Sequence, residues 1–229
     1  MELASVARPP DTSEMIEVSQ AGTVERVYRG ILRDLEEGRM VPGQRLVETD
    51  LATRYAVGRN AVREAMQRLA ARGVVDLARN RSPAIRWLDR AETLEVLDVA
   101  EAMTALALRS AASRYDRERD SAALQKTMEL LLEADRIDEI GAFSRARRHF
   151  YRVLLEIGGN RELQRLYPAI GMHIIYAQYQ TRRLRGIRLA DYRAIIDAVS
   201  LGDAAGAEQA GRTHVDHVRA SIPHDAPAG

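Results

Sequence analysis

The sequence predicts a mostly α-helical protein of two domains, in which a small N-terminal domain with two short strands precedes an all-helical antiparallel bundle. Three observations support this prediction. A length of 229 residues suits two domains, and a hydrophobic fraction of 46% is enough for a core in each. Two short strand patterns occur within residues 74–87, whereas helical periodicity covers nearly everything after residue 90.

The composition indicates a cytoplasmic protein and excludes several classes. Because the chain has no cysteine, it has neither a disulfide framework nor a thiolate metal site. No apolar run reaches the roughly 18 residues needed to span a bilayer, and the N-terminus lacks a signal-peptide pattern. The net charge is only +1, so the total charge gives no evidence for a nucleic-acid partner.

Residues 1–19 contain a Pro-Pro pair and little apolar periodicity, so we expect a mobile arm there. The arm could touch DNA through Arg8, although a simple mobile arm is the stronger alternative. The first helix should begin after Thr23 as its N-cap and stop at Gly38. Its apolar face consists of Val24, Val27, Ile31 and Leu35.

The strongest signal in the N-terminal domain, residues 20–87, is a helix that follows Gly58. Gly58 can serve as its N-cap, and Gly73 ends the segment. A short helix at residues 51–55 and a tight turn precede it, so the three form a helix-turn-helix. The apolar stripe of the second helix is Val62, Ala65, Met66 and Leu69, and the residues outside the stripe are Arg59, Asn60, Arg63, Gln67 and Arg68.

Basic charge is concentrated around this helix. Seven arginines lie between Arg59 and Arg86, against the two acids Glu64 and Asp76. Arg59 falls in the first turn, where a cation costs about 0.3–1 kcal/mol, and a nearby polyanion would offset that cost. A solvated surface face is the alternative. In a helix-turn-helix, the second helix enters the major groove with its N-terminal residues toward the base edges, where Asn can bind adenine and Arg guanine.

Residues 74–77 and 84–87 are expected to pair as two strands that form a wing. Arg79 and Arg81 at its tip suit contacts to phosphate or to the minor groove. The predicted DNA-binding residues are Thr49, Arg59, Asn60, Arg63, Arg68, Arg79 and Arg81.

Residues 88–90 are predicted to be a linker, and residues 91–222 an all-helical domain for effector binding and dimerisation, followed by a disordered tail at 223–229. The first helix, 91–115, is apolar most of the way round, which predicts burial on several sides. Pro168 should kink the 161–183 helix or split it after Tyr167, and Gly186 should separate it from the next helix. The other expected helices are 117–135, 138–158, 187–201 and 204–221.

Three segments of the N-terminal domain resemble the winged helix-turn-helix of the GntR family of bacterial transcription regulators: Leu46-Val-Glu48, Asp50-Leu-Ala52 and Val57-Gly-Arg-Asn-Ala-Val-Arg-Glu-Ala-Met66. The resemblance spans about residues 23–85, although Gly58, Asn60 and Ala61 stand where the family commonly has Ser, Thr and Pro. It implies a DNA-binding regulator, more commonly a repressor than an activator. A homodimer would double the contacts to a palindromic operator.

The second domain resembles FCD, the helical ligand-binding domain of FadR-type members. The resemblance rests on Phe143, Phe150-Tyr-Arg-Val-Leu-Leu-Glu-Ile-Gly-Gly-Asn160, Asp191-Tyr-Arg-Ala-Ile-Ile-Asp-Ala-Val-Ser-Leu-Gly-Asp203 and His214. Many relatives hold a divalent metal there with one Asp and three His. The corresponding positions here are Arg147, Tyr151, Tyr192 and His214, of which only His214 is a good ligand, so we predict no metal cofactor. A relocated site at His214 and His217, three residues apart, is the alternative.

The same positions predict a site for a small organic anion. A buried Arg147 with no carboxylate beside it is unfavourable unless an anion binds, and neighbouring hydroxyl and imidazole groups could donate further hydrogen bonds. The alternative is that Arg147 pairs with an acid such as Glu101 or Glu156, or extends to solvent. The predicted effector-binding residues are Thr104, Arg147, Tyr151, Tyr192 and His214, and Arg109 is a weaker candidate.

Three classes of function follow. The leading hypothesis is a ligand-responsive transcription regulator that a small organic acid releases or re-orients, through a changed angle across residues 87–90. An enzyme or small-molecule carrier with a winged-helix docking module is the second. We predict no enzyme, because the sequence has no nucleophile elbow, phosphate loop, zinc-protease signature or pair of catalytic acids. A non-specific architectural DNA binder would carry basic charge along the whole chain.

Overall fold

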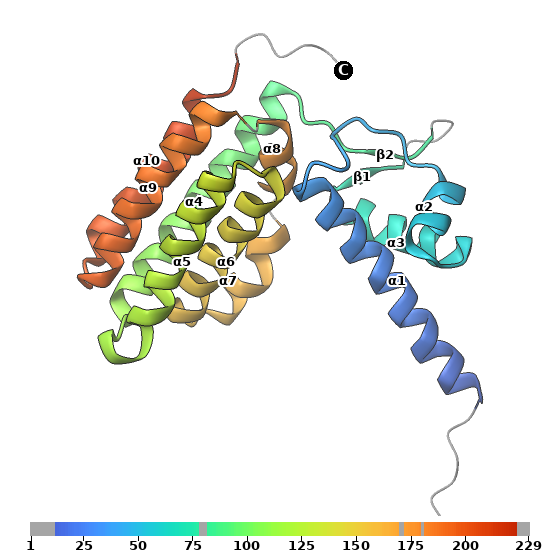
Figure 1. The fold of residues 1–229 in the computed structure, drawn as a ribbon, viewed down its shortest axis with the longest axis horizontal. Coiled ribbons are helices and arrows are strands. Elements are labelled where there is room, and N and C mark those ends of the chain that lie inside the picture. The colour runs from blue at the N-terminus through green and yellow to red at the C-terminus, as the bar shows by residue number, and fades with distance from the viewer. Residues whose placement is uncertain (1–11, 78–81, 170–171, 180, 224–229) are drawn as a thin grey trace, which may run out of the picture.

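The computed structural model describes residues 12–77, 82–169, 172–179 and 181–223. It shows the predicted fold class, a winged helix-turn-helix domain beside a helical bundle (Figure 1). The N-terminal domain consists of α1 (Thr12–Glu36), α2 (Glu48–Tyr55), α3 (Arg59–Ala70), β1 (Val75–Asp76) and β2 (Ala84–Ile85). The bundle consists of α4 (Arg90–Arg114), α5 (Arg117–Ile137), α6 (Ile140–Gly158), α7 (Arg161–Leu166), the 3-10 turn η1 (Tyr167–Ala169), α8 (Met172–Gln178), α9 (Arg182–Ser200) and α10 (Ala204–Ala220). Within the described residues, no helix is long and apolar enough to cross a membrane.

The N-terminal domain packs the apolar faces of α1, α2 and α3 together, as their periodicity predicts. Gly30 of α1 allows the closest approach, because a Cβ atom there would lie 2.5 Å from the ring of Tyr55. β1 and β2 pair in antiparallel register, with Val75 opposite Ile85. Arg45 forms an isolated bridge to Ala84, so the segment before α2 extends this small sheet.

The first helix is longer than the sequence pattern predicts. α1 begins at Thr12 rather than after Thr23, so the prediction of an arm over residues 1–19 is wrong for residues 12–19. Its remaining part, residues 1–11, lies outside the described residues. A helix extends at little cost once its packed part has formed, and no proline interrupts residues 12–36, so Gly22 alone does not stop it.

Two breaks in the bundle behave differently. Pro168 splits the predicted 161–183 helix, as expected, because its ring removes an amide donor and clashes with the preceding turn. Gly186 does not separate two helices, and α9 runs through it from Arg182. Thr181 caps α9 by accepting a hydrogen bond from the Leu184 amide at 3.1 Å, and the burial of Leu184 holds the first turn in place.

The two domains share one hydrophobic core. The cluster that contains the cores of α1, α2 and α3 continues through Leu88 into Leu97 of α4, Ile174 and Ile175 of α8, and Val218 of α10. α4 itself lies against α6, α9 and α10, which agrees with its nearly uniform apolar pattern. The interdomain contact is therefore part of the folded core, which limits independent movement of the domains.

The predicted linker at residues 88–90 is firmly attached. Leu88 is buried, and its backbone N–H and C=O both bond the side-chain amide of Gln178, each at 3.0 Å. Asp89 caps α4 and forms a reciprocal capping box with Glu92, so α4 already begins at Arg90. These bonds hold the backbone of residues 88 and 89, and the predicted change of angle across residues 87–90 stays a prediction.

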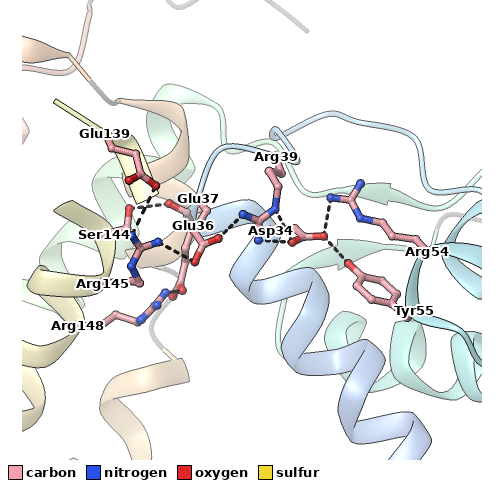
Figure 2. A network of polar contacts seen from close by, with 10 residues as sticks. All are labelled: Asp34, Glu36, Glu37, Arg39, Arg54, Tyr55, Glu139, Ser144, Arg145 and Arg148. Atoms are coloured by element: carbon pink, nitrogen blue, oxygen red, sulfur yellow. Dashed lines mark hydrogen bonds and ion pairs between the residues drawn. The ribbon is translucent and has the colours of Figure 1, made fainter. Parts of the chain in front are cut away.

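The C-terminal end of α1 carries a group of acids that joins the two domains (Figure 2). Asp34 faces its own domain, where it accepts hydrogen bonds from Arg39 at 2.6 and 2.9 Å and from the Tyr55 hydroxyl at 2.8 Å. Arg54 completes the set with an ion pair at 2.7 Å. Burial, and then the bond to Asp34, raises the pKa of Tyr55 above its usual range, so the phenol stays a donor.

Across the domain boundary, the last turn of α1 contacts α6. Ser144 donates a hydrogen bond to the Glu36 carbonyl at 2.6 Å, Arg145 contacts Glu37 at 3.3 Å, and Arg148 forms an ion pair with Glu36. We call these five residues the α1–α6 junction. It satisfies a terminal carbonyl of α1 and places cations at the negative end of its dipole.

We expect Asp34→Asn to lower the free energy of unfolding by about 3–5 kcal/mol, because it removes a charge that is only 2% exposed while its cationic and hydroxyl donors stay in place. Urea denaturation followed by circular dichroism measures the change. Glu129→Gln, which breaks an exposed pair with Lys126, is the control and should change stability by less than about 1 kcal/mol. Equal effects of the two substitutions would contradict a structural role for Asp34.

Candidate functional site

The helix-turn-helix presents the predicted basic surface. Ala56 takes a left-handed backbone conformation with φ of 52°, and this makes the tight turn between α2 and α3. Gly58 is the N-cap of α3 and supplies no side-chain hydrogen bond, as expected for glycine. Arg59 and Asn60 are exposed in the first turn, and no ion pair occupies Arg59 among the described residues. Both side chains are available to a nucleic acid.

Arg63 lies one turn further along α3 and is held by an acid. Its Nε atom donates to both carboxylate oxygens of Glu48, at 2.8 and 2.9 Å, and the arginine side chain remains 58% exposed. This bond fixes Arg63 against the start of α2, beside the exposed Thr49. The four predicted contacts Thr49, Arg59, Asn60 and Arg63 therefore share one end of the helix-turn-helix.

Arg68 does not belong to this group. It bonds Glu25 of α1 at 3.2 Å and its guanidinium lies 5.1 Å from the centre of the Tyr28 ring, so it packs against α1. Arg79 and Arg81 lie outside the described residues. Arg45 is an exposed cation beside the wing strand β2 that sequence analysis did not single out, since it sits in an irregular segment without a periodic pattern.

In the bundle, the predicted effector residues gather around a cluster of aromatic rings. The rings of Tyr151 and Tyr192 lie 6.1 Å apart, and those of Tyr192 and His214 lie 5.0 Å apart. Thr104 joins through a hydrogen bond of 3.0 Å with the hydroxyl of Tyr167. Burial raises the pKa of Tyr167 to about 12 and those of Tyr151 and Tyr192 well above 10, so all three phenols are neutral donors.

Two buried arginines lie at this cluster. Arg147 is 8% exposed and Arg188 is 3% exposed, and their guanidinium groups lie 4.2 and 4.6 Å from the centre of the Tyr176 ring. No carboxylate among the described residues pairs with either, and the Nε atom of Arg147 has no hydrogen-bond partner there. Burial lowers the pKa of Arg188, because the charged guanidinium loses its hydration in this environment.

The alternative partners of Arg147 are occupied elsewhere. Glu101 binds Arg212 and Arg219, and Glu156 binds Arg152. Arg109, the weaker candidate, contacts Glu208 on an exposed surface and lies away from the cluster. Sequence analysis missed Arg188, although its position four residues before Tyr192 on α9 would have placed it on the same helix face.

Asp191 orients both histidines of α10. The Nδ1 atom of His214 lies 2.9 Å from one oxygen of Asp191, and that of His217 lies 2.8 Å from the other. An ionised carboxylate only accepts, so each Nδ1 donates, and a neutral His214 then presents Nε2 as an acceptor. Burial lowers the pKa of His214, which favours this neutral form. The geometry therefore favours a role for His214 in positioning its neighbours over the predicted role as a hydrogen-bond donor to the anion.

His214 and His217, the residues of the alternative metal site, both bond the carboxylate of Asp191 through Nδ1. Within the part of the chain that the structure describes, no group of three His, Cys, Asp or Glu side chains that could hold a metal ion is found. The absence of a metal cofactor stays a prediction.

A cavity of about 650 Å³ opens beside Arg147, whereas Arg188 does not line it. On the bundle side its lining includes Arg147, Tyr151, Tyr167 and His173. Tyr192, His214 and Thr104 do not line it and pack behind these residues, so the structure separates the predicted set into a cavity wall and its support. Burial, and then the charge of Arg147, lowers the pKa of His173 to about 4, so this imidazole is neutral near pH 7.

A winged helix-turn-helix with an exposed basic helix, joined to a helical domain with a buried cationic cavity, defines a ligand-responsive DNA-binding transcription regulator. The chain belongs to the gntR family of bacterial regulatory proteins, whose profile matches residues 23–85, and it carries an FCD domain over residues 95–217.

The curated relatives are regulators as well. The chain is 26% identical to a probable D-xylose utilization operon transcriptional repressor of Paenarthrobacter nicotinovorans over 84% of each chain. It is 30% identical to an HTH-type transcriptional regulator of Mycobacterium tuberculosis, over 90% of this chain and 89% of that one. A GntR transcriptional regulator from a Rhodococcus species has the same fold, with a TM-score of 0.75, 21% identity, and coverage of 87% of this chain and 96% of that one. Both domains and the relatives indicate transcription regulation rather than an enzymatic activity.

Proposed function

We propose that this chain is a homodimeric repressor of a palindromic operator, and that a small organic anion binds in the bundle without a bridging metal and weakens operator binding. The observation that carries the proposal is the pair of buried arginines, Arg147 and Arg188, with no carboxylate beside them among the described residues. The role as a repressor is supported by relatives such as the probable D-xylose utilization operon repressor.

Operator recognition is assigned to the start of α3. Arg59 and Asn60 are exposed where base edges would lie, and Arg63 is held toward them by Glu48. The bond to Glu48 also limits the rotamers of Arg63, so less conformational entropy is lost when it meets a base. The arginines of the wing, Arg79 and Arg81, are assigned to phosphate or minor-groove contacts on the sequence pattern alone.

We expect Arg63→Ala to remove the preference for operator over random DNA, at a loss of about 1–3 kcal/mol in operator binding, because a base contact disappears. Arg81→Ala should weaken binding to all duplexes alike and reduce its salt dependence. Fluorescence anisotropy at several salt concentrations measures both. Arg68→Ala removes the same charge from the same helix but faces α1, so it serves as the control. An equal loss on both duplexes for Arg63→Ala would contradict its assignment.

The anion site is supported by the chemistry of its side chains. Arginine offers two parallel donors that match a carboxylate, and the neutral phenol of Tyr151 can add a third. Guanidinium and neutral phenol groups are poor ligands for a divalent metal, which supports direct contact with the anion. His173 is neutral and lies at the same wall, so it can donate a hydrogen bond without adding charge.

We expect carboxylates to raise the melting temperature of the wild-type protein equally with and without a chelator. Arg147→Gln should weaken binding by roughly 10- to 150-fold, the equivalent of about 1.5–3 kcal/mol for a charge-assisted contact. Arg188→Gln should do the same if its charge reaches the ligand. Arg165→Gln, which breaks an exposed pair with Glu162, is the matched control. Stabilisation that requires metal, or that survives Arg147→Gln unchanged, would refute the direct anion site.

We assign the contact between the two subunits of the proposed homodimer to an apolar strip on α4. Val99, Ala102, Met103 and Leu106 follow one another at helical spacing on a face that the rest of the described chain leaves partly or fully exposed. A second copy of the same strip would cover it in a two-fold contact and give two DNA-binding domains for the two halves of a palindrome.

We expect Val99→Glu to shift the protein to a monomer in sedimentation-velocity experiments, because it would place like charges close to the symmetry axis. Leu201→Glu is the control: Leu201 is 82% exposed and lies at the turn before α10, so the dimer should persist. A Val99→Glu protein that remains dimeric at the same concentration would place the dimer contact on another surface.

A further inference from the structure

The 650 Å³ cavity is not enclosed by the bundle alone. Its opposite wall comes from the DNA-binding domain, with Tyr28, Leu32 and Glu36 on α1 and Arg72 and Val74 in the segment that leads from α3 to β1. A molecule that fills this space therefore contacts the helical domain and the winged helix-turn-helix at once. The site lies at the interdomain contact, beside the α1–α6 junction.

The two domains contribute different chemistry to the cavity. The bundle contributes Arg147, whose Nε atom has no partner among the described residues, and His173, whose Nε2 atom has none there either. Both are polar groups that can meet an anion. Three other lining arginines, Arg145, Arg148 and Arg152, already have ion pairs with Glu37, Glu36 and Glu156. Arg147 differs from them because it is buried and has no carboxylate partner among the described residues, so we take it as the cation for the ligand.

The rest of the lining combines apolar side chains with charged ones, of which Glu36, Arg145, Arg148, Arg152 and Glu156 are in ion pairs. Tyr28 and Leu32 stand one turn apart on the same face of α1, and Val74, Pro168, Met172 and Leu155 complete this part. Arg68 and Arg72 lie 5.1 and 5.8 Å from the centre of the Tyr28 ring, so cation–π contacts hold this ring in place. An apolar group that covers Tyr28, Leu32 and Val74 would displace water from apolar surface, which is favourable.

We propose that the effector is an amphipathic organic acid that binds between the two domains, with its carboxylate at Arg147 and its apolar body against Tyr28, Leu32 and Val74. The inference rests on the proposed anion site and adds the class and placement of the ligand. A volume of about 650 Å³ lies in the usual range for sites that bury whole organic ligands, and a two-carbon acid would leave most of it empty.

This placement gives the ligand a direct path to the DNA-binding domain. Leu32 and Glu36 lie on α1, and Arg72 and Val74 follow the DNA-facing helix α3, so a ligand that touches them favours one arrangement of the domains over another. The α1–α6 junction borders the same space through Glu36 and Arg148, so the ligand and the junction act on the same pair of helices.

The test is a homologous series of straight-chain carboxylates, from acetate to decanoate, titrated into the full-length protein by isothermal titration calorimetry below their micelle concentrations. We expect affinity to rise about fourfold for each added CH₂ group until the cavity is full. Leu32→Trp fills the apolar end and should abolish this gain for the longer acids while the short acids bind as before. Leu166→Trp, on an exposed site of α7, is the matched control and should keep the gain.

The outcomes separate this inference from the proposed function. Arg147→Gln should weaken the binding of every acid by a similar factor, whatever the length of its chain, because it removes only the contact with the carboxylate. Binding that depends on Arg147 but not on chain length would overturn the amphipathic ligand and leave the anion site standing. A gain with chain length that Leu32→Trp does not change would place the apolar body elsewhere and would also overturn it. Absence of binding by any acid of the series would overturn both proposals.

Discussion

The arrangement of the two domains depends on how the acidic end of α1 is neutralised. Acidic side chains in the last turn of a helix face the negative end of its dipole, so Asp34, Glu36 and Glu37 would destabilise α1 on their own. Arg39 and Arg54 of the N-terminal domain meet Asp34, and Arg39 also meets Glu37, whereas Arg145 and Arg148 of α6 meet Glu37 and Glu36. Because Arg148 belongs to the bundle, Glu36 has this cation only when the domains are in contact, and the cavity lies beside that contact.

Helix α6 connects this contact to the buried cavity through neighbouring residues. Ser144, Arg145 and Arg148 face α1, while Arg147 and Tyr151, one turn apart, line the anion end of the cavity. A shift of α6 that improves one set of contacts changes the other, since a helix moves as a stiff unit. With the linker bonded to Gln178, a change in domain angle has to be accommodated at this helix contact, because the chain connection offers little freedom.

The parts that sequence predicted well depend on local patterns. The stripe of α3, its glycine cap and the split at Pro168 are set by residues within a few turns of one another. The pairing of Arg147 with Tyr151 on one face follows from helical spacing in the same way. Arg188, His173 and the wall formed by Tyr28 and Leu32 could not be placed, because they meet through tertiary packing between segments far apart in the chain. The predicted start of α1 was wrong for a different reason. A helix that has formed over its packed segment extends further along the chain, and this overrides weak local signals.

The buried arginines make the unliganded bundle energetically incomplete. Removing a guanidinium from water costs several kcal/mol, and contacts with the face of Tyr176 return about 0.5–2 kcal/mol each. The phenols of Tyr151 and Tyr192 close to these arginines are neutral, so they carry no negative charge to offset the rest. The proposed anion would supply that charge in a medium where electrostatic attraction is strong. Its binding would therefore stabilise the folded bundle by linkage, and the free energy gained there would favour the domain arrangement in which the anion is held best.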